Sequence, residues 1–305
     1  MSKSALVVCL NPTFELTISF NKFYENEVNR SNDYFVFPSG KGVNVARVLT
    51  QLGENATVFT HLGGNRATEF IDLCAAEHIT LRYFEAESPI RTCINIVNNE
   101  KSTSTELVQE PLPVEKEASK RALDLFSSLL PEFDALVITG TRANGYDENL
   151  YPQFVELAKA QKKFIVLDVK GDDLKKSLPF HPDIIKPNIT ELMATIGEGK
   201  VIFEHEDTEA LRDTVCDVMK RLYESYGTKS VISRGKFSTW AYDGAFIEVP
   251  NKDVPVVNTI GCGDALTAGL TFKLLAGSPL KDAVQFGMDC ALKSAQALQH
   301  GINLQ

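Results

Sequence analysis

The sequence predicts an α/β protein with a doubly wound, mainly parallel sheet, helices on both faces of that sheet, and a small β-sheet lid. Short apolar, β-branched runs alternate with longer segments of helical periodicity, which is the pattern of parallel strands joined by crossover helices. Two regions break the alternation with strand-like patterns and polar turns. No internal repeat or flexible linker divides the chain, so we expect residues 1–305 to form one domain with its lid.

The strand candidates are short and apolar. In order, they span 5–10, 56–62, 135–140, 164–168, 183–187 and 230–233. The helix candidates span 44–52, 66–77, 115–130, 147–161, 207–226 and 280–299. In the first of these helices the apolar residues recur with the spacing of one helix face, at Val45, Val48, Leu49 and Leu52.

The two interrupting regions, 14–38 and 91–110, are predicted to be hairpins. They would leave the main sheet at the ends of its strands, where ligands bind in open α/β folds. We therefore expect a β lid over a binding site. The hairpins are also expected to expose strand edges and aromatic side chains, which favours a homodimer joined lid to lid. These aromatic residues are Phe14, Phe20, Tyr34 and Phe35.

Composition argues against several classes of partner. The net charge of -9 and the pI near 5.2 disfavour a nucleic-acid surface, which carries a basic patch. The 6 cysteines form no C-x-x-C pair and the 5 histidines have no ligand spacing with them, so we expect reduced thiols. No apolar run approaches the roughly 20 residues of a membrane span, and the N-terminus turns polar too early for a signal peptide. A cytoplasmic protein without membrane or nucleic-acid partners is expected.

Two glycine-containing stretches do not fit the common nucleotide motifs. Residues 261–266, GCGDAL, lack the third glycine of a dinucleotide fingerprint and do not follow the first strand. Residues 39–44, SGKGVN, do not match the P-loop pattern. A dinucleotide site and a Walker-type ATPase are therefore both disfavoured.

A different chemistry suits the first stretch. Gly261, Cys262 and Gly263 can present successive backbone N–H groups at the N-terminus of a helix beginning near Asp264, which is a nest for negative charge. Such donors stabilise the charge that develops on a transferring phosphoryl group. Asp264 could then accept the proton of an attacking hydroxyl. The alternative is that Asp264 only caps the helix.

Both stretches resemble the ribokinase-like sugar kinases, also called the phosphofructokinase B family. Residues 261–269, GCGDALTAG, match the family's G-A-G-D signature with Cys262 in place of alanine. Residues 39–46, SGKGVNVA, are similar to its G-G-K-G-x-N-x-A signature with Ser39 in place of the first glycine. The resemblance covers almost the whole chain and is greatest to the 1-phosphofructokinase and tagatose-6-phosphate kinase group. A match at both ends of the chain is highly specific.

The resemblance implies roles for the C-terminal residues. It makes Asp264 the catalytic base and Gly261, Cys262 and Gly263 the anion hole, and so favours catalysis over a simple helix cap.

Further positions are implied at the nucleotide. Residues 186–192, KPNITEL, look like the family's N-x-x-E element, which places Lys186 and Asn188 at the nucleotide. Asn188 and Glu191 would arrange water and Mg²⁺ near its phosphates. The alternative is that these two residues form a capping box, and both roles are compatible.

Residues 231–242 resemble the strand-loop-strand that borders the ATP phosphates, at Ser233 and Gly235, although a plain hairpin turn would give the same pattern. Arg234 stands where the family has an apolar residue. Arg142 departs from the family's turn after a central strand and could reach the transferring phosphate or be a solvated loop cation.

The acceptor end of the site is implied by three segments. In residues 10–17, LNPTFELT, Glu15 replaces the acid that binds sugar hydroxyls in the family, with a solvent-facing acid as the alternative. The Asn44 amide can both donate to and accept from hydroxyls. The implied binding residues in the glycine turn and at the second lid segment are Ser39, Gly40, Lys41 and Arg91. Lys41 and Arg91 match positions that hold a sugar phosphate, whereas such cations are elsewhere usually solvated.

The implied function is an ATP-dependent, Mg²⁺-requiring kinase that phosphorylates a ketohexose phosphate to a bisphosphate. Fructose 1-phosphate, tagatose 6-phosphate and fructose 6-phosphate are the candidate acceptors. Two alternatives stay open. The first is a kinase of an unphosphorylated sugar or nucleoside, which would not need Lys41 and Arg91. The second is a non-catalytic phosphosugar sensor that retained the fold.

Overall fold

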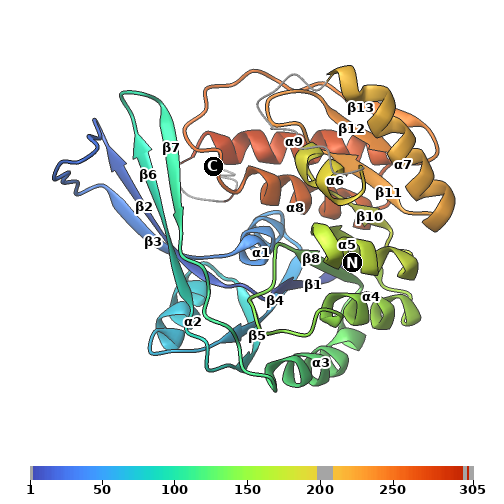
Figure 1. The fold of residues 1–305 in the computed structure, drawn as a ribbon, viewed down its shortest axis with the longest axis horizontal. Helices are drawn as coiled ribbons and strands as arrows, with labels where there is room; N and C mark the ends of the chain where they lie inside the picture. The colour runs from blue at the N-terminus through green and yellow to red at the C-terminus, as the bar shows by residue number, and fades with distance from the viewer. Residues whose placement is uncertain (1–2, 198–208, 298–300, 302–305) are drawn as a thin grey trace.

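The computed structural model describes residues 3–197, 209–297 and 301, and within these ranges the strands form two sheets (Figure 1). The larger sheet has the strand order β13-β12-β11-β10-β9-β8-β1-β4-β5. Its strands are β1 (Ser4–Cys9), β4 (Asn55–Leu62), β5 (Thr80–Glu85), β8 (Ala135–Thr139), β9 (Phe164–Asp168), β10 (Ile184–Ile185), β11 (Lys229–Ile232), β12 (Thr239–Tyr242) and β13 (Phe246–Val249).

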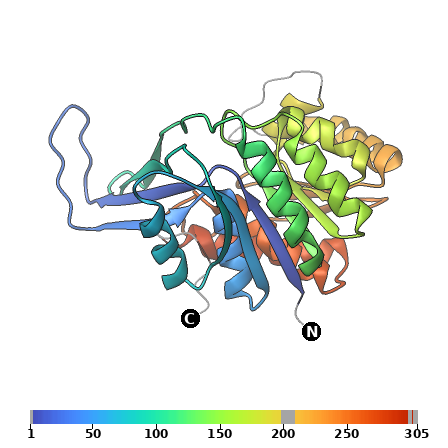
Figure 2. The same ribbon diagram turned by 90° about the horizontal axis from the view of Figure 1, so that it is seen from below.

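Helices cover both faces of the larger sheet, because its central strands are apolar on both sides. Along β1, Leu6 and Val8 belong to one hydrophobic layer, while Ala5 and Val7 belong to the other. The first layer includes α3 (Ala118–Leu129), α4 (Leu150–Ala160), α5 (Gly171–Ser177), α6 (Ile189–Thr195) and α7 (Arg212–Tyr226). The second includes α1 (Lys41–Gln51), α2 (Ala67–Ala76), α8 (Cys262–Leu275) and α9 (Leu280–Ala295). Figure 2 shows α3 and α4 on one side of the sheet and α8 and α9 on the other.

The direction of winding reverses at β1. This strand pairs in parallel with β4 on one side and with β8 on the other, so that Ala5 lies opposite both Ala56 and Ala135. The sheet is parallel from β5 to β11, and the last two pairings, β11 with β12 and β12 with β13, are antiparallel. The predicted doubly wound, mainly parallel sheet is therefore confirmed.

The two predicted hairpins form one small sheet, which projects from the larger one (Figure 1). Its strands, in the order β3-β2-β6-β7, are β3 (Tyr34–Ser39), β2 (Thr13–Phe20), β6 (Arg91–Asn98) and β7 (Thr103–Val108). The hairpins β2–β3 and β6–β7 are antiparallel, but β2 and β6 pair in parallel, with Glu15 opposite Cys93. The two hairpins thus share one continuous ladder.

All six strand candidates are present, with their ends displaced by no more than two residues. Of the helix candidates, the first begins three residues early, at Lys41. A 3-10 turn, Glu209–Leu211, precedes α7, while residues 207–208 and 298–299 of two predicted helices lie outside the described residues. The strand β5 and the short helices α5 and α6 were not predicted as such.

The expectation that four hairpin aromatic residues are exposed is wrong for two of them. Phe14 is fully buried and meets Phe70 edge to face at 5.4 Å between ring centroids. Phe20 is also buried, with 9% of its surface exposed. Tyr34 and Phe35, on the outer strand β3, are exposed as expected. Side chains an even number of positions apart on a strand share a face, and Phe14 and Phe20 lie on the face of β2 that Phe70 and Phe23 cover.

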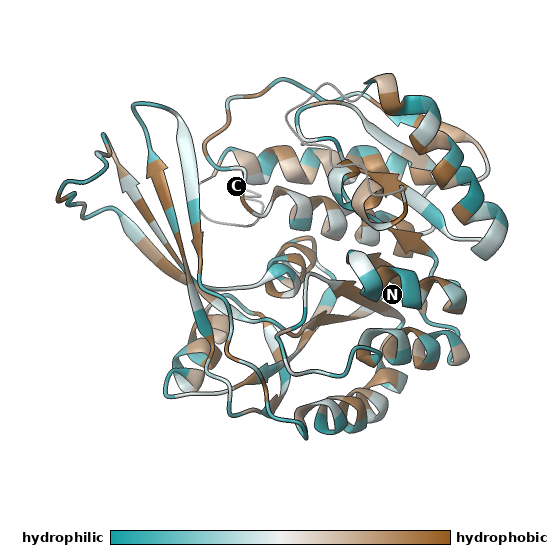
Figure 3. Cartoon of the chain, viewed as in Figure 1, coloured by the Kyte–Doolittle hydropathy of each residue, from teal (hydrophilic) through white to brown (hydrophobic). Residues whose placement is uncertain are grey.

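Apolar residues are concentrated in the strands of the larger sheet, where Figure 3 is mostly brown, whereas many of the helices also carry hydrophilic residues. Among the helices in the described ranges, none combines the length with the apolar character that crossing a bilayer requires.

The buried histidine of β4 makes stability depend on pH. His61 lies 2.8 Å, through Nδ1, from the Tyr146 hydroxyl, and burial lowers its pKa from 6.5 to about 4. Between these values the unfolded chain binds more protons than the folded one, so the stability from neutral His61 is present above pH 6.5 and is lost as the pH falls towards 4. We expect a loss of roughly 3 kcal/mol at most in the free energy of unfolding.

Urea unfolding at several pH values between neutrality and pH 4 measures this effect, with His61→Gln as the comparison. The variant should show a flatter dependence. An equally steep dependence in both proteins would contradict the assignment to His61.

Candidate functional site

A cavity of about 1100 Å³ lies at the carboxyl ends of the central strands. Cys9 and Asn11 at the end of β1, Thr139 and Gly140 at the end of β8, and Asp168 at the end of β9 line it. This is the place where the strand order reverses, at which open α/β sheets bind their ligands.

The cavity brings together all the site residues that the sequence singled out as catalytic or binding. They are Glu15, Ser39, Gly40, Lys41, Asn44, Arg91, Lys186, Asn188, Glu191, Ser233, Gly235, Gly261, Cys262, Gly263 and Asp264. These residues come from the small sheet, from loops that follow strands of the larger sheet, and from helices on both of its faces, so their convergence is a property of the fold.

The N-terminus of α8 points into this cavity. Gly261 is the N-cap residue and has a left-handed φ of 80°, a conformation that favours glycine. The N–H groups of the first turn have no acceptor within a helix. Among the described residues outside the turn itself, a Cβ atom on Gly263 would find only Lys186 Nζ within 4 Å, at 4.0 Å, so the space in front of this turn is open to an anion. Asp264 lies inside the first turn, so it is not the N-cap residue, although a carboxylate at this position also suits the helix dipole.

A buried hydrogen-bonded chain leads from Asp264 to the small sheet. The amide nitrogen of Asn44 donates to Oδ2 of Asp264 at 2.9 Å. The Ser39 hydroxyl lies 3.2 Å from Asn44 Oδ1 and 3.0 Å from Oε2 of Glu15. Asp264 and Glu15 are 5% and 3% exposed, so the alternative of a solvent-facing Glu15 is wrong.

Close packing of glycine backbone places α1 beside this chain. Gly40 has a φ of 109°, and a Cβ atom there would lie 2.8 Å from Cys9 Sγ. The first turn of α1 can therefore begin directly over the end of β1. A Cβ atom on Gly140 would lie 3.1 to 3.4 Å from the methylene groups of Lys41. The Lys41 side chain therefore lies over the end of β8.

A buried ion pair supports the other side of the cavity. Lys186 Nζ lies 3.3 Å from Oδ2 of Asp168, and both side chains are 3% exposed. Thr267, one turn along α8 from Gly263, donates to the same carboxylate at 3.0 Å. The sequence reasoning missed Asp168, although an acidic residue directly after the apolar run 164–167 is a signal that could have found it.

The predicted N-x-x-E element forms the capping box that was kept as its alternative. The Asn188 side chain accepts from the Glu191 N–H at 2.7 Å, and Glu191 Oε2 accepts from the Asn188 N–H at 3.1 Å. The other oxygen of Glu191 lies 3.7 Å from Lys170 Nζ. Both residues still line the cavity.

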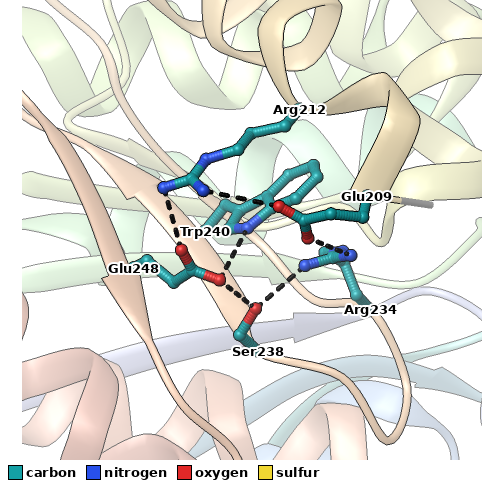
Figure 4. A network of polar contacts seen from close by, with 6 residues as sticks. All are labelled: Glu209, Arg212, Arg234, Ser238, Trp240 and Glu248. Atoms are coloured by element: carbon teal, nitrogen blue, oxygen red, sulfur yellow. Dashed lines mark hydrogen bonds and ion pairs between the residues drawn. The ribbon is translucent and has the colours of Figure 1, made fainter. Parts of the chain in front are cut away.

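The side chain of Arg234, the departure from the family pattern, is buried outside the cavity lining and belongs to a network of polar contacts (Figure 4). Its guanidinium carbon lies 3.7 Å from the ring centroid of Trp240. It donates to Ser238 at 2.9 Å and pairs with Glu209 at 3.2 Å. Ser238 in turn donates to Glu248, whose pKa this hydrogen bond lowers. The network fixes the loop 233–238, which carries the cavity residues Ser233 and Gly235.

Arg142, the other departure, is neither a solvated cation nor a cavity residue. It forms an ion pair with Asp173 at 3.1 Å and donates to the Tyr146 carbonyl at 3.3 Å. The prediction that it could reach a transferring phosphate is therefore wrong for this structure, because its guanidinium is held by α5.

An apolar end of the cavity was not predicted. It is formed by residues after β13 and by one face of α9, namely Val254, Val256, Ile260, Met288, Ala291, Leu292 and Ala295. Ala291 and Ala295 are one helical turn apart on the same face of α9, where their small side chains leave room for a ligand. That spacing was visible in the sequence.

A family model described as pfkB family carbohydrate kinase matches residues 8–304. The chain belongs to this family. Its members are carbohydrate kinases, so the protein is a phosphotransferase with a hydroxyl group as acceptor, as the resemblance of its two signatures implied.

Solved structures show the same fold. A Thermotoga maritima protein described as a possible 1-phosphofructokinase has a TM-score of 0.87 and 22% identity, over 98% of this chain and 94% of that one. Escherichia coli phosphofructokinase-2 in complex with fructose-6-phosphate has a TM-score of 0.82 and 21% identity, over 96% and 93%. The tetrameric inhibited form of phosphofructokinase-2 has a TM-score of 0.83 and 22% identity, over 97% and 94%. At these identities the likeness extends to the fold alone.

In this carbohydrate kinase, Cys262 replaces the alanine of the family signature, and its thiol is not ionised. Burial raises the pKa of the Cys262 thiol to about 12, and the Asp264 carboxylate adds to the effect. The thiol is therefore neutral at physiological pH, and it brings no negative charge to the N-terminus of α8.

Proposed function

We propose that the protein is an ATP-dependent, Mg²⁺-requiring kinase that transfers the γ-phosphoryl group of ATP to a hydroxymethyl group of a ketohexose phosphate. The products are a ketohexose bisphosphate and ADP. The observation that carries the proposal is the buried carboxylate of Asp264, held by Asn44 in the first turn of α8 beside the open backbone turn at Gly263. Fructose 1-phosphate, tagatose 6-phosphate and fructose 6-phosphate are the candidate acceptors.

In the proposed reaction Asp264 takes the proton of the acceptor hydroxyl as the hydroxyl oxygen attacks the γ-phosphorus. The bond between this phosphorus and the β–γ bridging oxygen breaks, and ADP leaves with the bond electrons. The N–H groups of Gly261, Cys262 and Gly263, together with the Lys186 ammonium, would hold the negative charge of the transferring group. Asn44 orients the carboxylate, since its amide donates to one of the two oxygens.

The small sheet and α1 would bind the acceptor. Glu15, Ser39 and Asn44 present a carboxylate, a hydroxyl and an amide, which suit sugar hydroxyls. Gly40 contributes backbone at the same turn. Arg91, at the start of β6, donates through Nη1 to the Gln109 carbonyl at 3.1 Å, while its buried Nε has no hydrogen-bond partner among the described residues. A buried donor without a partner is expensive, and a phosphate oxygen would satisfy it.

The nucleotide would occupy the other end of the cavity. Lys186, Asn188, Ser233 and Gly235 would border its phosphates, and the apolar end of the cavity at α9 would leave room for the adenine ring. Family membership implies ATP as the phosphoryl donor.

The residues of the capping box fit a Mg²⁺ ion bound through water. Mg²⁺ prefers oxygen ligands and retains several of its waters. The capping box uses Oε2 of Glu191 and leaves Oε1 beside Lys170, on the cavity. Asn188 and Glu191 would hold the waters of the ion. When bound, Mg²⁺ would neutralise charge on the ATP phosphates.

We also propose that residues 1–305 act as a single kinase domain and that the small sheet is its lid, formed by the segments near 14–38 and 91–110. Exposed apolar side chains lie on both outer strands of this sheet. They are Tyr34, Phe35 and Val36 on β3, and Leu107 and Val108 on β7. Unpaired strand edges with such side chains favour pairing with a second copy, so the proposed partner is an identical chain joined lid to lid. The proposed compartment is the cytoplasm.

Asp264→Asn should lower kcat by about 10²–10⁴-fold, because an amide keeps the shape but cannot take a proton. Steady-state kinetics with a candidate phosphosugar measure this loss. ATP affinity and the thermal melting temperature serve as controls and should remain near those of the wild type. A variant that keeps most of its turnover would refute base catalysis by Asp264.

The acceptor itself is tested with a panel of fructose 1-phosphate, tagatose 6-phosphate, fructose 6-phosphate, and the free sugars. The phosphate of the acceptor should be held by charge-assisted hydrogen bonds from Arg91 and Lys41. Arg91→Ala should therefore raise the KM for the phosphosugar at least about tenfold while leaving the KM for ATP within about twofold. Arg82→Ala, on an exposed arginine outside the cavity, is the matched control.

Equal kcat/KM values for a free sugar and its phosphate would move the protein to the class of kinases with unphosphorylated acceptors. Tight phosphosugar binding without transfer would instead identify a sensor.

The lid-to-lid dimer predicts a mass in solution of about twice the chain mass of 33.7 kDa. Light scattering coupled to size exclusion at micromolar concentration measures it. Charge on the exposed edge opposes burial, so Tyr34→Asp combined with Phe35→Asp should shift the protein to a monomer. A monomeric wild type would rule the dimer out.

A further inference from the structure

A buried arginine that no motif singled out contacts the acceptor network. Arg47 lies on α1, one turn after Asn44, and is 4% exposed. Its Nη1 donates to Oδ1 of Asn44 at 2.8 Å. Its Nη2 donates to the Pro38 carbonyl, and its Nε donates to the Glu77 carboxylate. The guanidinium thus joins α1, the end of β3 and the residue that follows α2.

These contacts fix which way the Asn44 amide points. A guanidinium only donates hydrogen bonds, and an ionised carboxylate only accepts them. Asn44 lies between Arg47 on one side and Asp264 on the other. Only one orientation satisfies both neighbours, with the oxygen toward Arg47 and the nitrogen toward Asp264. In the flipped orientation the Asn44 nitrogen would face the donors of Arg47, and the Asn44 oxygen would face the carboxylate of Asp264.

The Ser39 hydroxyl lies beside the same amide oxygen of Asn44. This group has one hydrogen, and both Asn44 Oδ1 and Glu15 Oε2 lie within reach of it. The Asn44 oxygen has two lone pairs and can accept from both Arg47 and Ser39. Hydrogen bonds to an ionised group are the stronger kind, so the hydroxyl donates preferentially to the Glu15 carboxylate.

We propose that Arg47 is a positioning residue for the phosphoryl transfer: by fixing the Asn44 amide, it sets both the hydrogen bond to Asp264 and the donor pattern offered to the acceptor sugar. This inference rests on the proposed function of Asp264 as the base. Arg47 does not itself line the cavity, so its effect passes through Asn44.

Lysine could not replace this side chain. Three acceptors surround the planar guanidinium and are met by different nitrogens, whereas an ammonium presents its donors from a single point. Arg47→Lys therefore keeps the charge next to Glu77 but loses the geometry that holds Asn44.

The test is a double-mutant cycle of Arg47→Lys and Asn44→Ala, assayed for kcat, for KM of both substrates and for thermal stability. Arg47→Lys alone should lower kcat about tenfold or more, because small misplacements of reacting groups have large effects on rate, and should leave the KM for ATP within about twofold. In the Asn44→Ala background the same substitution should change kcat less than about twofold.

Glu77→Gln is the matched control, because it breaks the ion pair of Arg47 and leaves the contact with Asn44. It should lower the melting temperature while kcat stays within about twofold of the wild type. Any of three results would overturn the proposal. Glu77→Gln could lower kcat as much as Arg47→Lys does, or Arg47→Lys could cause its full loss of kcat in the Asn44→Ala background. The third is that Arg47→Lys alone causes no loss of kcat.

Failure of the proposed function would look different. If the wild type phosphorylates none of the three phosphosugars, the proposed function fails. The same double-mutant cycle is then repeated with the dissociation constants of these sugars, measured without ATP, in place of kcat. Arg47→Lys should weaken binding at least about fivefold only where Asn44 is present. Equal weakening in both backgrounds, or no binding of any of the three sugars to the wild type, would refute the role of Arg47.

Discussion

The hydrogen bond between Asn44 and Asp264 joins residues that lie 220 positions apart in the chain, and the whole site depends on it. It forms only because α1 and α8 lie side by side over the point where the sheet changes its direction of winding. Glycine makes this approach possible, since a Cβ atom on Gly42 would lie 2.5 Å from that of Cys9 on β1. The two family signatures are therefore one structural unit, although they occupy opposite ends of the sequence.

Three buried cations in or near the cavity wall are each paired with a carboxylate. Asp168 is paired with Lys186, Arg47 with Glu77, and Arg234 with Glu209. A buried charge is tolerated only with such compensation, and each pair also ties one loop of the site to a neighbouring helix. Of these three cations, Lys186 lines the cavity, whereas Arg47 and Arg234 support residues beside it. The site is organised before any ligand arrives.

The sequence was sufficient for features that depend on local pattern, and insufficient for those that depend on tertiary contact. The apolar runs 135–140 and 164–168 could be assigned because strands buried on both faces need such residues, and the two signatures identified the cavity. The strand β5 was missed because, at the sheet edge, four of its six residues are exposed. Arg47 gave no signal, and Arg234 stood out only as a departure from the family pattern, since nothing in their spacing indicates which distant acceptors surround them.

The parallel pairing of β2 with β6 joins the two hairpins into one continuous sheet. Thr13 and Arg91 are register partners, so Glu15, two residues along β2, keeps a fixed separation from the arginine. For the proposed acceptor, this rigid sheet holds the carboxylate of Glu15 and the cation of Arg91 at a fixed distance. A sugar engages the carboxylate and the cation together only if its hydroxyls and its phosphate are the right distance apart. Isomeric sugar phosphates would then be distinguished by the distance between their hydroxyls and their phosphate. The backbone hydrogen bonds between β2 and β6 set the distance that the site accepts.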